Sequence, residues 1–166
     1  MKRLKWIFIV FAATIALSAC SSSDLVFEER KDFSENKWLR FEADTFRVDI
    51  KNIDDCYDIF FHCRYMPSID TSVTIIPIMF RMVSPSGQMR SFVYNFTIRN
   101  KNGNLEGDKL GAIIDNKSRM REHFFFNEVG EYTMTAQQLT SFYEISEVMG
   151  IGLKVVKSKL DYSFPE

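Results

Sequence analysis

The chain has 166 residues, enough for one domain and an export segment, and nothing in it suggests a second core. Hydrophobic residues make up 46% of it, and 16 Phe and 6 Tyr against 7 Gly and 4 Pro favour strands. The 21 basic residues include Lys2, Arg3 and Lys5 of the export segment, which leaves 18 basic and 22 acidic residues, a formal charge of −4. A mildly acidic chain without clustered Lys or Arg argues against nucleic acid as a partner.

The first nineteen residues have the organisation of a secretory signal peptide. Residues 1–5 supply positive charge, and residues 6–17 form an apolar stretch shorter than the about 20 residues that span a membrane. The stretch ends in Leu17-Ser18-Ala19-Cys20, which resembles the lipobox of bacterial lipoproteins. There the Cys thiol is joined to diacylglycerol, the chain is cut before the Cys, and the new amine is acylated. We therefore expect a lipoprotein signal peptide over 1–19 and lipidation of Cys20; the alternative is an ordinary cleaved signal peptide with an incidental Cys.

The residues after Cys20 bear on location and domain organisation. Ser21 is not the Asp that resembles the inner-membrane retention signal of enteric bacteria, and no acidic run that resembles a surface-export signal follows. We expect a lipoprotein of the outer membrane that faces the periplasm, held there by its lipid anchor. The expected organisation is the acylated Cys and a tether over 20–30, followed by a single β-sandwich domain over 31–166.

Alternating apolar and polar residues predict the first two strands. Residues 46–50 place apolar side chains at every second position, and residues 57–65 repeat the pattern more strongly. Residues 52–55 supply turn chemistry between them. Both strands are therefore expected to bury one face and to keep the other in water.

A hairpin is predicted next. Residues 73–83 are apolar on both parities, as in a strand buried on both faces, although Pro77 indicates a bulge or an edge. Residues 84–87 (SPSG) turn the chain, and residues 92–98 form the answering strand.

The rest of the chain continues this pattern after a polar loop over 100–107. Residues 137–149 are ambiguous, and we expect at most one or two turns of helix there. Further strands are predicted at residues 120–126, 132–136 and 151–155. Seven or eight short strands with almost no helical period predict an all-β fold, an antiparallel β-sandwich, with the jelly-roll among the topologies open to it.

Several motifs occur together across the chain. The C-terminal ones are Gly130-Glu131-Tyr132-Thr133, Gln137-Gln138-Leu139 and Gly150-Ile151-Gly152-Leu153-Lys154-Val155; the N-terminal ones are Cys20, Trp38, Phe41, Arg64-Tyr65 and Ser84-Pro85-Ser86-Gly87. Together they resemble the GldH-like gliding-motility lipoproteins of the Bacteroidetes, in which a GxYxFxxxQ strand precedes a GIxxVGLRIxK ending. The family's PDG turn and Gly-rich stretch are altered here, as in a divergent member. The resemblance implies a non-enzymatic envelope lipoprotein of a gliding-motility or secretion-associated assembly.

No group of residues amounts to a catalytic site, so we predict no enzyme, no catalytic residue and no cofactor. Ser34 and Lys37 have the spacing of a nucleophile pair but lie in a polar approach to a strand. His62 and His123 are isolated, which is typical of half-buried surface histidines and not of metal ligands. A hydrolase is therefore the last of the functions considered.

Two other features have ordinary explanations. Cys56 and Cys63 on one extended segment would lie about 23 Å apart, too far for a disulfide, so both are expected to be reduced. Residues 100–108 alternate Asn, Glu and Asp around Gly103, faintly like a calcium loop. A solvated loop is favoured there because most of the oxygens belong to neutral Asn, and no metal ligand is assigned.

Two functions from different classes stay open. The first is an interaction surface for other envelope proteins, formed by aromatic residues that exceed what a small core holds, with candidates Trp38, Phe41, Phe124 and Phe125. The second is binding of a glycan or another ligand. Exposed coplanar aromatic rings near residues 100–108 would favour the second function.

Overall fold

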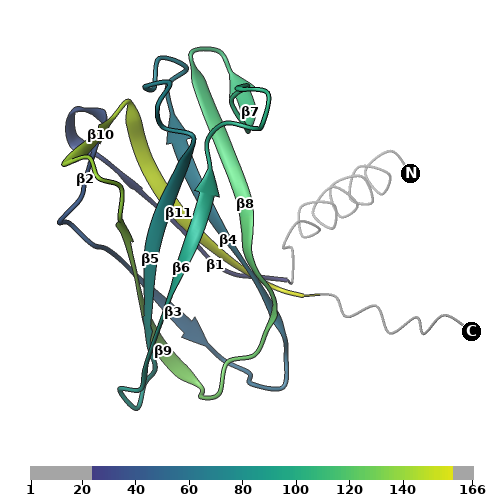
Figure 1. Cartoon of the computed structure of the whole chain (residues 1–166). Helices are drawn as coiled ribbons and strands as arrows, with labels where there is room; N and C mark the ends of the chain where they lie inside the picture. The colour runs from purple at the N-terminus through teal and green to yellow at the C-terminus, as the bar shows by residue number, and fades with distance from the viewer. Residues whose placement is uncertain (1–23, 159–166) are drawn as a thin grey trace, which may run out of the picture.

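The structure is a computed structural model that describes residues 24–158. In that range the chain forms one short 3-10 turn, η1 (Ser34–Asn36), and eleven strands (Figure 1). The strands are β1 (Leu25–Asp32), β2 (Lys37–Leu39), β3 (Asp44–Ile50), β4 (Tyr57–Tyr65), β5 (Ile75–Val83), β6 (Met89–Thr97), β7 (Asp108–Leu110), β8 (Ile113–Phe124), β9 (Gly130–Gln138), β10 (Glu144–Ser146) and β11 (Val148–Lys157). The expected signal peptide over 1–19 and Cys20 lie outside the described residues. Within them, no helix is long and apolar enough to span a membrane.

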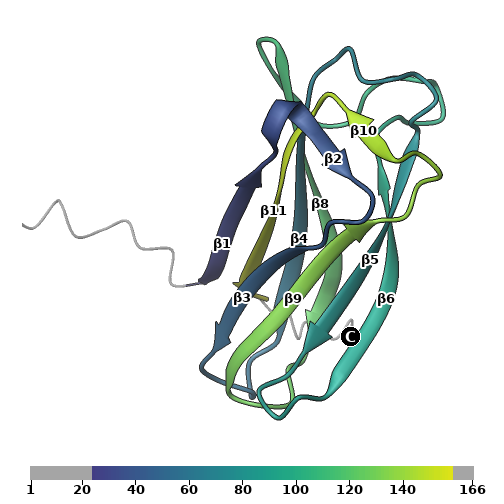
Figure 2. The same ribbon diagram turned by 90° about the vertical axis from the view of Figure 1, so that its left-hand side faces the viewer.

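The long strands form two antiparallel sheets that face each other (Figures 1 and 2). The five-stranded sheet has the order β1-β11-β4-β8-β7, the four-stranded sheet has the order β3-β9-β5-β6, and β2 pairs with β10. We call the end that carries β2, β10 and β7 apical, and the end that carries the β3–β4, β5–β6 and β8–β9 connections basal. The prediction of an all-β, antiparallel fold is confirmed.

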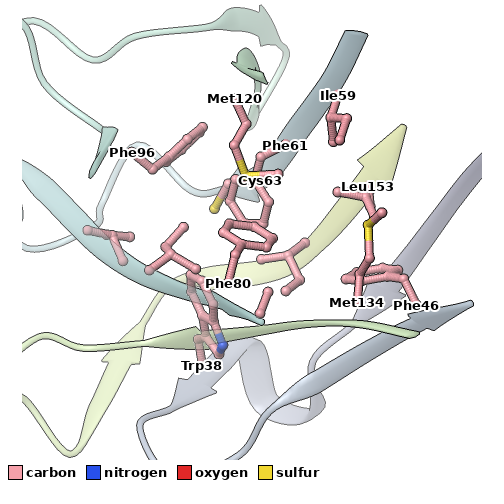
Figure 3. Packing of buried hydrophobic residues seen from close by; sticks show 14 of the residues in the cluster. Trp38, Phe46, Ile59, Phe61, Cys63, Phe80, Phe96, Met120, Met134 and Leu153 are labelled. Atoms are coloured by element: carbon pink, nitrogen blue, oxygen red, sulfur yellow. The ribbon is translucent and has the colours of Figure 1, made fainter. Parts of the chain in front are cut away.

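The core lies between the sheets, and aromatic rings dominate it (Figure 3). The ring centroid of Phe61 on β4 lies 5.5 Å from that of Phe80 on β5 and 5.2 Å from that of Phe96 on β6. Trp38 on β2 closes the apical side of this cluster by stacking on Phe61, at 6.2 Å. Rings bury a large apolar area each, so a domain of this size is stabilised by a few such contacts across the sheets.

The alternation in the first predicted strand and in the one over 132–136 is confirmed. Phe46, Val48 and Ile50 on β3 are fully buried. The register pairs Phe46 with Met134 and Val48 with Tyr132 on β9, and both partners are buried as well. Period-two patterning therefore set both the strand type and the face that points inward.

The expected water-exposed face of β4 is largely covered, which corrects the prediction. Asp58 and His62 are only 8% and 6% exposed, although they point away from the core. β4 lies in the middle of its sheet, between β11 and β8, so long side chains from neighbouring strands cover it. One of them is Arg30 on β1, whose stem crosses bare backbone at Gly152 beside His62.

The strand predicted to be buried on both faces, β5, has only one buried face. Its outward residues are partly or fully exposed, with Ile75 48% exposed, because no further layer covers the four-stranded sheet. The hairpin through 84–87 is confirmed, with Gly87 at φ 86° in its turn. The bulge or edge expected at Pro77 is not found, because β5 lies between β9 and β6 and Pro77 pairs with Asn95 in an unbroken register. The Pro77 carbonyl accepts the Leu139 N–H one residue past the end of β9, so the missing N–H of Pro77 faces a point where pairing with β9 has already ended.

Strand pairing decides the structure of two further segments. Residues 25–30, expected in the tether, belong to β1 and pair with β11. Residues 28–31 are all charged, so no alternation of apolar and polar residues marks them as a strand. Residues 137–149, which were ambiguous and expected to hold at most one or two turns of helix, contain bends and β10, because pairing with β2 outweighs the local apolar spacing. Cys56 and Cys63 are buried free cysteines, as predicted.

Candidate functional site

A cavity of about 340 Å³ opens at the apical end, between the β4–β5 connection and β10. This volume falls in the range of about 300–1,000 Å³ that is usual for ligand pockets. Buried Val73 and Ile145 contribute to its wall. Three carboxylates, two hydroxyls and one ring complete the lining: Asp70, Glu144, Glu147, Ser68, Ser146 and Phe142. We call this cavity the apical groove.

Backbone hydrogen bonds hold the two sides of the groove together. The Met66 N–H donates to the Glu147 carbonyl at 2.9 Å, which fastens the β4–β5 connection to the β10–β11 junction. The Asp70 carboxylate accepts the Ser72 N–H at 2.7 Å, and this bond lowers the pKa of Asp70. Because these contacts fix the backbone, the groove is preformed.

Charge in the groove is only partly neutralised. Lys37 Nζ lies 3.4 Å from a carboxylate oxygen of Glu35 and 3.4 Å from one of Glu144, and these two acids raise the pKa of Lys37. Glu147 has no ion pair among residues 24–158. The groove therefore keeps an acidic character that suits a cationic or hydroxyl-rich group.

Exposed aromatic rings lie next to the groove. Phe41 is 72%, Tyr143 66% and Phe142 43% exposed, and we call these three residues the apical aromatic patch. The rings of Phe41 and Tyr143 are 6.0 Å apart and tilted by 56°, and the Arg40 guanidinium lies 5.6 Å from the centre of the Phe41 ring. The Arg40 N–H donates to the Tyr143 carbonyl, so the segment just after β2 and the one just before β10 hold the two rings side by side. Large exposed rings that cluster in this way are typical of interaction sites.

The four aromatic candidates from the sequence separate in the structure. Trp38 is 1% exposed and belongs to the core, and Phe124 is half-buried against Phe126. Phe41 lies in the apical aromatic patch, whereas Phe125, 54% exposed, lies in the β8–β9 connection at the opposite end. The sequence therefore identified one member of the patch.

Sequence patterns missed the groove for a physical reason. Its acids come from the β4–β5 connection and, more than seventy residues later, from β10 and the residue that follows it, and neither segment has a period that marks a site. Phe142 and Tyr143 fall in the segment that was ambiguous between helix and loop. The only local signal was that two aromatic residues, Phe142 and Tyr143, are adjacent in a segment without a regular apolar period.

A cluster of charged and polar side chains lies on the outer face of the five-stranded sheet, around Gly152. The register aligns Arg30, Gly152, His62 and Lys117 in one row across four strands. Because Gly152 on β11 has no side chain, Arg30 reaches across to Asp115 on β8, 3.3 Å away, and Arg64 approaches the same carboxylate at 3.0 Å. Burial by itself would raise the pKa of Asp115, but the hydrogen bond from Arg64 and the charge of Arg30 hold this pKa below its ordinary value.

His62 is more buried than predicted, and His123 more exposed. Both ring nitrogens of His62 are buried without a hydrogen-bond partner within the described chain. Burial, with the charges of Arg30 and Lys117, lowers the pKa of His62 to about 4. His123 presents its backbone N–H to Asp58 at 3.0 Å. The two histidines therefore belong to separate environments.

The remaining catalytic candidates are not brought together. Ser34 is exposed in η1, and Lys37 is held as a cation by two acids, which removes it as a general base. In the loop over 100–108, the Asn100 side-chain oxygen accepts the N–H groups of Asn102 and Asn104, both at 3.0 Å, and so shapes the loop. In the part of the chain that the structure describes, no three His, Cys, Asp or Glu side chains are placed to hold a metal ion.

Comparisons with known proteins identify relatives of this chain. A protein-family model described as GldH lipoprotein matches residues 25–155. A curated relative, the gliding motility lipoprotein GldH homolog of Christiangramia forsetii, is 22% identical over 156 residues, which cover 90% of this chain and 94% of that protein.

Two solved structures show a weak likeness to this chain. Dimeric latent PorU from Porphyromonas gingivalis aligns with 85% of this chain at 9% identity and a TM-score of 0.36, and the chain spans 14% of that protein's length. A structure of infectious bursal disease virus, Gx strain, aligns with 84% of this chain at 11% identity and a TM-score of 0.33, and the chain spans 31% of its length. Similarities at this level carry no argument about function.

Proposed function

The chain belongs to the GldH lipoprotein family, and we propose that it is a non-enzymatic interaction component of a gliding-motility or secretion-associated assembly in the cell envelope. The observation that carries this proposal is the apical aromatic patch beside the acidic groove. Three exposed rings and a preformed cavity provide a surface for a partner, whereas the polar side chains of the described residues do not converge as a nucleophile, a base and a stabilising donor would.

The proposal includes the location. After removal of residues 1–19, the acylated Cys20 holds the protein in the outer membrane, facing the periplasm. Membership of a lipoprotein family supports the anchor, and the lipobox-like Leu17-Ser18-Ala19-Cys20 supports Cys20 as the acylated residue. Ser21 in place of Asp supports the outer membrane.

We also infer a jelly-roll topology for the domain over 24–158. Eight strands form the order β1-β11-β4-β8 in one sheet and β3-β9-β5-β6 in the other. Every connection between successive long strands passes from one sheet to the other, except the β5–β6 hairpin. This interleaving supports the two Greek keys of a jelly roll, a fold that does not by itself indicate an activity.

Binding of a glycan is the alternative, and the acidic groove next to aromatic rings is the observation that favours it. Two features weigh against it. The Phe41 and Tyr143 rings are tilted by 56° and so do not form a flat platform for a sugar face. The loop over 100–108 contains no aromatic residue.

Site-specific crosslinking in the native envelope tests the interaction surface. The photoreactive substitution Tyr143→benzoylphenylalanine probes the apical aromatic patch. Val93→benzoylphenylalanine, at a residue 51% exposed on the outer face of β6, is the matched control. We expect Tyr143 to crosslink gliding or secretion components that Val93 does not reach.

Two results would contradict the proposal. Equal protein adducts at both positions would mean that the apical aromatic patch has no special role. Glycan adducts at Tyr143 without protein adducts would favour the alternative function.

A further inference from the structure

The two ends of the described chain meet at one place on the molecule. The Lys157 N–H donates to the Asp24 carbonyl at 2.7 Å, and the Ser158 N–H donates to the Cys56 carbonyl at 2.8 Å. β1 therefore begins beside the β3–β4 connection, in the basal half of the sandwich (Figure 2).

Covalent geometry limits how far this place can be from the bilayer. Only five residue steps separate Cys20 from Leu25, the first residue of β1. A fully extended chain spans at most about 3.6 Å per residue, so these steps reach about 18 Å. An acyl chain on Cys20 therefore keeps the start of β1 close to the lipid headgroups.

Exposed apolar side chains gather around this place. Ile53 in the β3–β4 connection is 41% exposed, and Phe125 and Val129 in the β8–β9 connection are 54% and 56% exposed. The two connections are neighbours, since Tyr57 pairs with Phe124 and Ile50 pairs with Gly130. Leu25, 43% exposed, adds a fourth apolar side chain.

Part of the charge at the same end is paired. Lys157 Nζ lies 2.7 Å from a carboxylate oxygen of Asp55, and Lys51 pairs with Asp49. Each of these two acids has its own cation, and Glu128 accepts hydrogen bonds from Ser84 and Ser86, whereas the exposed Asp54 has no ion pair among residues 24–158. The pairing therefore lowers, without removing, the charge that opposes contact with a lipid surface.

From these four observations we propose that the basal end, defined by Leu25, Ile53, Phe125 and Val129, rests on the lipid leaflet that holds the acylated Cys20. The occupant of this surface is the bilayer interface, into which the apolar side chains insert. The apical groove and the apical aromatic patch then face away from the membrane, toward the periplasm. This inference rests on the lipid anchor of the proposed function.

The test uses the acylated full-length protein in vesicles of phosphatidylethanolamine and phosphatidylglycerol. Phe125→Cys at the basal end and Tyr143→Cys at the apical end carry an environment-sensitive fluorophore. The parent protein gives the background, since Cys56 and Cys63 are 3% and 0% exposed. We expect lipids spin-labelled near the headgroup to quench the probe at position 125 several-fold more than the probe at 143.

Two measurements distinguish failure of the lipid anchor from failure of the inference about the basal end. Flotation of the protein with the vesicles reports the anchor, and Cys20→Ser should abolish it; failure of the acylated protein to float would reject the anchor and the inference together. Flotation with equal quenching at both positions, or stronger quenching at 143, would overturn the inference alone. Val129→Cys repeats the measurement if Phe125→Cys does not fold.

Discussion

Single residues on the outer face of the five-stranded sheet explain how charge is packed there. Gly152 lacks a side chain, so the stem of Arg30 crosses β11 and covers His62 on the next strand. His62 is thereby enclosed beside two cations. Alternation correctly assigned His62 to the outer face, but it could not show that Arg30, two strands away in the same row, would cover it.

Acid should destabilise the protein through His62. Its pKa is lowered from 6.5 to about 4 in the folded protein, so the unfolded chain binds more protons between those pH values, and stability falls as the pH falls through this window. The His62 contribution to this change between pH 7 and pH 4 is expected to be a loss of about 2–3 kcal/mol, measured by urea unfolding as the difference between the parent and a variant that lacks this imidazole.

The comparison with His62→Gln isolates this contribution. Asp44 acts in the opposite sense, because burial raises its pKa to about 6, so the absolute pH curve sums both groups. The His62→Gln protein should lose less stability in acid than the parent. Parallel curves for the two proteins would show that His62 does not titrate differently in the folded and unfolded states.

At the scale of elements, close packing of β1 on β11 depends on Gly150. A Cβ at this position would lie 2.4 Å from the Lys31 carbonyl oxygen, a backbone atom that cannot move without shifting β1. The motif Gly150-Ile151-Gly152-Leu153-Lys154-Val155 thus has a structural meaning. Its odd-numbered residues fill the core, and its two glycines let a charged edge strand approach.

Gly150→Ala should lower the free energy of unfolding by about 1–3 kcal/mol, because β1 must move away from β11. Urea unfolding measures the loss, and faster amide exchange in β1 than in β4 would locate it. Gly103→Asn is the control, since its Cβ meets nothing within 4 Å and Asn tolerates the φ of 79°. A Gly150→Ala protein as stable as the parent would contradict this account.

At the scale of the whole molecule, the two sheets are held by rings that interlock across the core. Phe61 is fully buried, and its ring contacts Phe80 and Phe96 from the other sheet. Phe41, by contrast, stands on the surface of the apical aromatic patch. The same residue type therefore has a structural role in one place and is free for partners in the other.

The two Phe→Ala substitutions separate these roles. Phe61→Ala should cost about 3–5 kcal/mol of stability, because it leaves a cavity that the two sheets cannot close. Phe41→Ala should change stability by less than about 0.5 kcal/mol while weakening crosslinking at Tyr143. Thermal unfolding checks both. A large loss of stability for Phe41→Ala would place that ring in the core and contradict its assignment to the patch.

The sequence by itself determined the strand type and inward face of β3 and β9, the hairpin after β5 and the family, because these depend on local period, turn chemistry and motifs. Only the tertiary structure decided that β4 is covered on both faces and that residues 25–30 form an edge strand. It also brought Asp70 and Glu147 together beside exposed rings. Such features depend on which strands become neighbours across long connections, and the period of a single strand does not encode its neighbours.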